Sequence, residues 1–127
     1  MSDPYYDAPP MPEEFVDEDT PDEFGKAEAE ERASNQDMLE DGLAEGYYSS
    51  LPTTMLAPLY AYVLDHEQPG GFLTAVITND LVGAITKADI ANSKHLRKWV
   101  LFFHWHTPSA CHGSQAHMDA WLRKKAR

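Results

Sequence analysis

The chain has 127 residues, 43% of them hydrophobic, with one cysteine and a formal net charge of −11 at pH 7. A single cysteine excludes an internal disulfide scaffold, and no run approaches the roughly 20 apolar residues that a membrane-spanning helix requires. The N-terminus, Met1-Ser2-Asp3-Pro4, has neither the basic start nor the apolar core of a signal peptide, so we expect a cytoplasmic protein.

The charge is divided unevenly along the chain. Residues 1–50 contain 16 acids and two bases, a net charge of −14, whereas residues 51–127 contain 5 acids and 8 bases, a net charge of +3. This division predicts an acidic N-terminal arm over residues 1–50 and a compact domain over residues 51–127.

The arm is poor in the apolar residues that folding requires. Residues 1–25 combine five prolines with a dense run of acids. Because like charges repel and little apolar surface can be buried, we expect this arm to be largely disordered. Residues 26–45 are rich in helix formers but have only a short apolar stripe, which predicts a marginal helix there.

Aromatic residues are spaced among the acids of the arm. This mixture is typical of acidic segments that dock apolar anchors on a partner protein, while their charge speeds the encounter with a basic surface. The alternative is a tail that only increases solubility. The residues expected to contact a partner are Tyr5, Tyr6, Glu13, Glu14, Phe15, Asp17, Glu18, Asp19 and Phe24.

Apolar positions in residues 51–127 follow the three-and-four spacing of helices. A first helix is predicted after Pro52, and the turn sequence at residues 69–71 separates it from a second helical stretch that runs to about residue 91. Within that stretch Asp80 is a candidate cap for a fresh helix. Paired rather than alternating apolar positions disfavour a strand over residues 73–78. Ser114 is the expected cap of a last helix.

Residues 93–106 contain the sequence Lys98-Trp99-Val100-Leu101-Phe102-Phe103-His104-Trp105. A helix that is apolar nearly all round must be surrounded by other elements. The predicted fold is therefore all-α, a small bundle of four to five short helices around a central helix 93–106, preceded by the acidic arm.

Histidines and the cysteine gather in the C-terminal third of the chain. His104 and His106 are two positions apart, about 200° around a helix axis, so both cannot face one ion while the helix continues. The paired Cys-x-x-Cys pattern of many zinc sites is absent. We therefore expect neither a metal nor a cofactor. The zinc-type ligands considered are His104, His106, Cys111, His112 and His117.

A thiol nucleophile would need Cys111 with a lowered pKa, a histidine base and an acid that orients the base. His112 adjoins the cysteine, but the nearest acid along the chain is Asp119. We expect a small packed thiol and a protein that is not an enzyme. A small zinc or thiol hydrolase is the alternative from another functional class.

Basic residues could support contacts with nucleic acid, with Trp121 as a stacking ring. The patch is modest, and the acidic arm would compete for it. The sequence therefore argues against direct binding of nucleic acid. The bases concerned are Lys94, Arg97, Lys98, Arg123, Lys124, Lys125 and Arg127.

Residues 52–123 resemble a family of small uncharacterised bacteriophage and prophage proteins. The most specific part is Pro69-Gly70-Gly71-Phe72-Leu73 followed by Asn79-Asp80-Leu81. Further matching residues are Leu59, Tyr60, Tyr62, Val63, Ala75, Val76, Ala88, Asp89, Pro108, Cys111, Gly113, Ser114 and Trp121. His112 stands where the pattern has a tryptophan, and the arm lies outside the resemblance.

The resemblance implies a phage accessory protein that acts in the host cytoplasm by binding a host or phage protein. Our leading hypothesis is a non-enzymatic interaction module whose acidic arm docks on a basic surface of that partner. A sharper version is an inhibitor of a host defence or transcription enzyme that mimics nucleic acid, because spaced carboxylates can occupy a phosphate-binding groove. The aromatic content is also compatible with a homo-oligomer.

Overall fold

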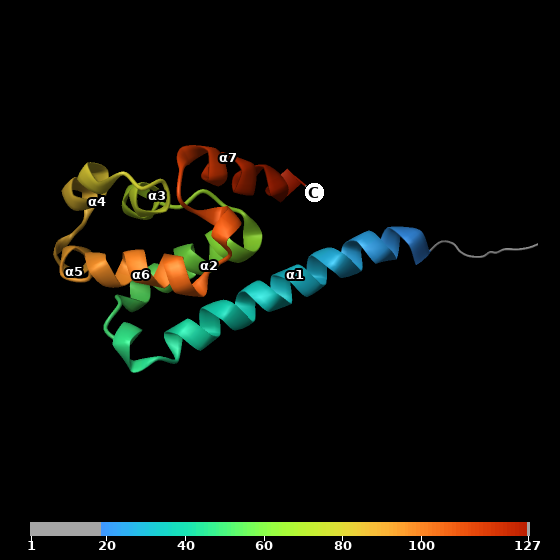
Figure 1. The fold of residues 1–127 in the computed structure, drawn as a ribbon, viewed down its shortest axis with the longest axis horizontal. Helices are drawn as coiled ribbons and strands as arrows, with labels where there is room; N and C mark the ends of the chain where they lie inside the picture. Colours follow the sequence, from blue (N-terminus) through green and yellow to red (C-terminus); the bar gives the residue numbers. More distant parts are fainter. Residues whose placement is uncertain (1–18, 127) are drawn as a thin grey trace, which may run out of the picture. The chain divides into compact units, whose positions relative to one another are not determined.

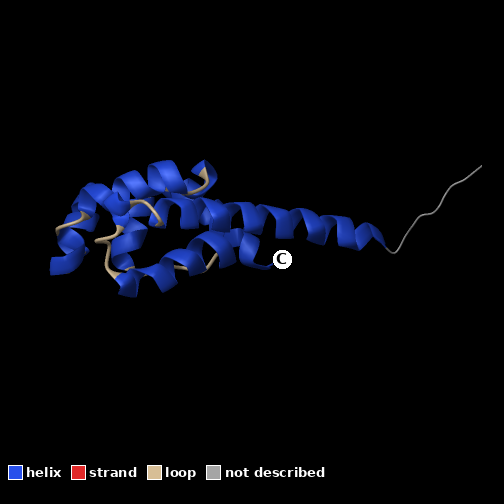
Figure 2. Cartoon of the chain, turned by 90° about the horizontal axis from the view of Figure 1, so that it is seen from below, coloured by secondary structure: helices blue, strands red, loops and turns tan. Residues whose placement is uncertain are grey.

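The computed structural model describes residues 19–126, with the side chains of residues 25–125. The chain divides into two compact units, Met1–Ala33 and Ser34–Arg127. Over the described residues every element is a helix, and none is a strand (Figure 2). The predicted all-α class is therefore confirmed.

Helix α1 spans Asp19–Leu43 and is longer than the marginal helix predicted over residues 26–45. It begins near Pro21, whose missing N–H donor is harmless in a first turn. Residues 19–33 of this helix are the described part of the first unit.

Residues 34–50 belong to the same compact unit as the predicted domain. Leu39 is fully buried, and Tyr48, at the end of η1 (Gly46–Tyr48), is also buried. The ring of Tyr48 packs edge-on against Phe102 at 5.2 Å. The second unit therefore begins at Ser34, and residues 34–50 contribute side chains to its core.

The second unit continues through short helices joined by tight turns (Figure 1). No helix within residues 19–126 is long and apolar enough to cross a membrane. The α-helices after α1 are α2 (Leu56–Asp65), α3 (Gly71–Ile77), α4 (Leu81–Lys87), α5 (Ile90–Ser93), α6 (Leu96–His106) and α7 (Gln115–Arg123). The remaining 3₁₀ turns are η2 (Thr53–Met55), η3 (Ser109–Cys111) and η4 (Lys124–Ala126).

Helix caps explain several of the boundaries. Asp80 accepts a hydrogen bond from the Gly83 N–H at 2.9 Å, so the predicted break after α3 is confirmed. Ser114 accepts one from the His117 N–H at 3.1 Å and begins α7, also as predicted. Asp89 accepts a hydrogen bond from the Asn92 N–H at 2.8 Å and caps α5, so this short helix begins separately from α4.

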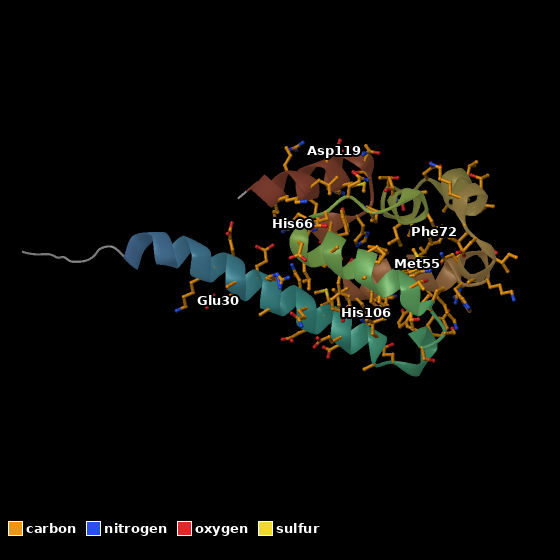
Figure 3. The ribbon with its side chains drawn as sticks, turned by 180° about the vertical axis from the view of Figure 1, so that it is seen from behind. Glu30, Met55, His66, Phe72, His106 and Asp119 are labelled. Carbon is orange, nitrogen blue, oxygen red and sulfur yellow. The ribbon has the colours of Figure 1, made fainter. Side chains whose placement is uncertain are left out.

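The core of the second unit is built on the inner side of α6. Trp99 and Phe102 are fully buried, and the Trp99 indole donates a hydrogen bond to Asn92 Oδ1 at 3.0 Å. Phe72 of α3 lies inside the unit against Trp99, whereas Asp119 lies on the outer side of α7 (Figure 3). Aromatic packing around Trp99 thus holds the unit together.

The central helix is shorter and less enclosed than the sequence predicted. Residues 93–106 are divided between the end of α5 and α6. Val100 is 48% exposed and Trp105 is 65% exposed, so the expectation of a fully surrounded helix is wrong. A unit of this size has too few residues to cover every side of α6.

Candidate docking face

A hollow of about 190 Å³ opens between α3, α4 and α6. Its walls are mostly apolar, which is the usual chemistry of a docking site. The lining residues are Ala75, Val76, Asn79, Asp80, Leu81, Ala84, Leu96 and Val100.

Leu81 and Val100 line this hollow and remain in contact with solvent, and further exposed aliphatic side chains follow Leu81 on α4. Leu81 is 63% exposed, Val82 is 71% exposed and Ile85 is 55% exposed, all on α4. Val100 borders the hollow from α6 and Leu96 lies one turn before it. We call these five residues, Leu81, Val82, Ile85, Leu96 and Val100, the docking face. A cluster of exposed aliphatic side chains around a hollow marks an interaction surface.

The local sequence of α4 explains why its large residues point outward. Gly83 and Ala84 are the buried residues of this helix, which packs closely against α3. A Cβ atom at position 83 would collide with the Asp80 carboxylate as it stands, so a larger residue there would require the capping side chain to shift. Small residues therefore occupy the inner side of α4, and Leu81, Val82 and Ile85 are left outside.

Sequence reasoning missed this face because it used only the three-and-four spacing of the stretch, in which Val82 has no place. The spacing of Leu81, Ala84, Ile85 and Ala88 predicts one apolar side but not which members are covered. The available signal was the pair Leu81-Val82 directly after a cap, because two neighbouring residues cannot both face inward on so short a helix.

Bases flank the docking face on α6. Arg97 and His104 lie three residues before and four residues after Val100, next to it on the helix surface. The Arg97 guanidinium donates a hydrogen bond to the Tyr47 hydroxyl at 2.8 Å, which uses one of its five N–H donors. The acid in the hollow, Asp80, is engaged as a cap. On α6 the side chains beside Val100 are therefore basic, while the Asp80 carboxylate keeps its negative charge in the wall of the hollow.

His104, His112 and His117 lie near one another. Burial lowers the pKa of His112, and the nearby His104 and His117 lower it further. The Nε2 atom of His112 is buried and has no hydrogen-bond partner among the described residues. Its ring lies 6.1 Å from that of Phe103. His112 is therefore held in its neutral form.

The histidines considered as zinc ligands in the sequence analysis lie in different environments. His106 lies on the other side of α6 from His104, where its Nε2 is 3.3 Å from Glu45 Oε2 and its ring meets Tyr48 at 5.2 Å (Figure 3). His104 is exposed, and its ring lies 4.5 Å from that of Trp105. Within the part of the chain that the structure describes, no group of three or more His, Cys, Asp or Glu side chains could hold a metal ion.

Cys111 lacks the surroundings of a reactive thiol. It is fully buried, and burial raises the pKa of its thiol to about 11. The thiolate is the nucleophilic form, so a raised pKa suppresses reactivity near pH 7. The geometry therefore supports a packing role for this side chain rather than hydrolase chemistry.

Trp121 is not available as a stacking ring, so this part of the nucleic-acid hypothesis is wrong. It is only 2% exposed, and its indole donates a hydrogen bond to the Tyr62 carbonyl at 2.9 Å. The ammonium group of Lys124 lies 4.3 Å from the centre of the ring. On α6, Lys98 donates a hydrogen bond to the Ser50 hydroxyl at 2.7 Å.

The residues predicted to contact a partner lie at or beyond the edge of the described structure. Asp19 and Phe24 belong to the first turns of α1, and their side chains are not described. Tyr5, Tyr6, Glu13, Glu14, Phe15, Asp17 and Glu18 lie outside the described residues.

Comparisons with known proteins found no match for the chain among protein families, curated proteins or solved structures.

Proposed function

We propose that this chain is a non-enzymatic protein-interaction module, a phage-type accessory protein that binds a host or phage protein in the cytoplasm. The observation that carries the proposal is the docking face, where the exposed Leu81 and Val100 line a hollow of about 190 Å³ and the exposed Val82 and Ile85 lie on the same short helix as Leu81. Apolar surface of this kind is stabilised when a partner covers it.

The acidic arm is the second part of the proposed mechanism. Residues 1–33 contain 12 acids and two bases. A charge of that density speeds the encounter with a basic surface, whereas the docking face would slow dissociation by burying apolar area. The two parts therefore contribute to different rate constants.

The test uses full-length protein, because Leu39 and Tyr48 lie in the core and a deletion of the whole predicted arm would remove them. Partners captured from host extract are purified and their binding kinetics are measured at low and high salt. The arm variant carries Glu13→Gln, Glu14→Gln, Asp17→Asn and Glu18→Gln. The face variant carries Ile85→Asp, and Trp105→Asp is a matched control outside the docking face.

The arm variant should lower the association rate and weaken its dependence on salt. The face variant should mainly raise the dissociation rate, while the Trp105 control should behave as wild type. Unchanged kinetics in both variants would contradict the proposal. Competition between the chain and duplex DNA for the captured partner would favour the version in which the acidic arm mimics nucleic acid, and simultaneous binding would exclude that version.

A further inference from the structure

We propose that the docking face of one copy binds the N-terminal acidic segment of a second copy, residues 11–18, so that chains associate head to tail. The segment reads Met11-Pro12-Glu13-Glu14-Phe15-Val16-Asp17-Glu18 and lies outside the described residues. This inference goes beyond the proposed function, because it names an occupant for the face and requires no host protein.

The size and chemistry of the hollow match an apolar anchor of this segment. An apolar cavity of about 150 Å³ can hold one benzene molecule, and the hollow has a volume of about 190 Å³. It therefore has room for one ring such as that of Phe15. Leu81 and Val100 at its edge would contact the neighbouring Val16 and Met11.

The charges of the two surfaces are complementary. The segment contains four acids and no base. Arg97 and His104 flank Val100 on α6, and both acids between residues 80 and 100 are engaged as helix caps. On the α6 side of the hollow, carboxylates next to an apolar anchor would thus meet Arg97 and His104, while the Asp80 carboxylate lies on the α4 side.

A symmetric contact between two docking faces is less favourable. A twofold axis would place Arg97 and His104 of one copy against the same residues of the other. Two arginines facing each other repel, and the two acids between residues 80 and 100 are held at the N-terminal ends of α4 and α5 as caps. The head-to-tail arrangement avoids this conflict, and the matching segment is present at the same concentration as the face.

Sedimentation velocity of the full-length chain over a concentration series tests the proposal. The monomer mass is 14.3 kDa. At low salt the weight-average mass should rise at least twofold with concentration, because each copy offers one segment and one face and the association does not close on itself. High salt should shift the series back toward the monomer.

Two variants locate the contact. Val100→Asp disables the face and keeps the segment, whereas the combination Glu13→Gln, Glu14→Gln, Phe15→Ala, Asp17→Asn and Glu18→Gln disables the segment and keeps the face. Each variant alone should remain monomeric at every concentration. An equimolar mixture of the two should form a heterodimer, because the first supplies an intact segment and the second an intact face.

Trp105→Asp is the matched control, since it places the same charge on an exposed apolar position of α6 away from the hollow. It should associate as wild type does. Leu81→Asp repeats the test on α4 in case Val100→Asp alters the helix content measured by circular dichroism.

Three results would overturn the inference. The first is a wild-type chain that stays monomeric at all concentrations and salt levels. The second is association that persists in either variant, which would indicate a symmetric contact or another surface. The third is a mixture of the two variants that forms no heterodimer. None of these results depends on a host protein, so they are distinguishable from a failure of the proposed function.

Discussion

The hydroxyl of Tyr62 donates a hydrogen bond to the main-chain carbonyl of Cys111 at 2.6 Å, across 49 positions of sequence. Both residues are fully buried, so neither atom can turn to water instead. The carbonyl of Tyr62 in turn accepts a hydrogen bond from the Trp121 indole. One residue of α2 therefore fixes both η3 and α7.

Removing this hydroxyl should destabilise the second unit. Tyr62→Phe keeps the ring but leaves the Cys111 carbonyl buried without its donor, which costs about 1–3 kcal/mol. Urea unfolding followed by tryptophan fluorescence measures the change. Tyr60→Phe on the same helix is the control, because Tyr60 is only partly buried, and its effect should stay within about 0.5 kcal/mol. Equal losses in the two variants would contradict the role given to the buried hydrogen bond.

A close approach between α1 and α6 requires glycine at position 42. A Cβ atom there would lie 2.5 Å from His106 Cγ and 2.8 Å from Phe102 Cε1. Gly42→Ala should therefore destabilise the second unit by about 1–3 kcal/mol through overpacking, even though alanine is the better helix former.

Gly25→Ala in the same helix is the matched control, because a Cβ atom there meets nothing within 4 Å. It should raise the helix content or leave it unchanged, as read by circular dichroism at 222 nm. If Gly42→Ala proved as stable as wild type, the close approach of position 42 to His106 and Phe102 would be contradicted.

The cap of α4 also maintains the shape of the docking face. Asp80→Ala removes the acceptor for the Gly83 N–H and should cost about 0.5–2 kcal/mol, whereas Asp80→Asn should cost much less because asparagine caps helices well. Thermal unfolding of both variants measures the difference. Equal stability of the two variants would show that Asp80 contributes through its charge or not at all.

The sequence contained enough information to predict the helical class and several boundaries, but not the surfaces. Asp80 and Ser114 were identified as caps because an N-cap acts locally, through a side chain and a backbone donor three residues away. Which side of α4 is covered depends on how closely α3 approaches Gly83 and Ala84, a relation that no spacing pattern contains. For Trp105 the spacing likewise predicts an apolar position on α6 but does not show whether another element covers it.

Composition also does not show where the second compact unit begins. Residues 34–50 carry charge and glycine like the residues before them, so composition placed them with the arm. Their burial depends on two side chains, Leu39 and Tyr48, and on the absence of a side chain at Gly42. Such single contacts are invisible to composition, which averages over many residues.

Cys111 predicts a loss of stability at alkaline pH. Burial raises the pKa of its thiol from 9.0 to about 11, so the unfolded chain loses this proton first as the pH rises. The stabilising contribution is complete below pH 9 and disappears between about pH 9 and 11. Cys111→Ala should flatten that part of the pH profile, although the raised pKa of Tyr62 leaves a slope of the same sign.

The same burial predicts a slow reaction of the thiol with a disulfide reagent at pH 8. The rate should match that of unfolding and should rise sharply in urea. An exposed cysteine introduced as Ser49→Cys is the control and should react at once, since Ser49 is exposed. Rapid labelling of Cys111 in the native protein would contradict its burial.

The burial of His112 predicts a loss of stability at acidic pH, whereas the burial of Cys111 predicts one at alkaline pH. Burial, and then the neighbouring His104 and His117, lower the pKa of His112 below its ordinary value of 6.5. The unfolded chain therefore binds this proton first as the pH falls, so the stabilising contribution is present above pH 6.5 and is lost as the pH falls through the lowered pKa. His112→Phe removes the titrating group and the unpartnered Nε2 atom, so its stability should depend less on pH between 7 and 5 than that of wild type.

His117→Gln removes only a neighbouring charge and should move the His112 pKa upward, which a titration of the His112 ring protons by NMR measures. A His112 that titrates at its ordinary pKa in the wild type, with no response to His117→Gln, would show that its surroundings are more hydrated than the buried Nε2 atom indicates.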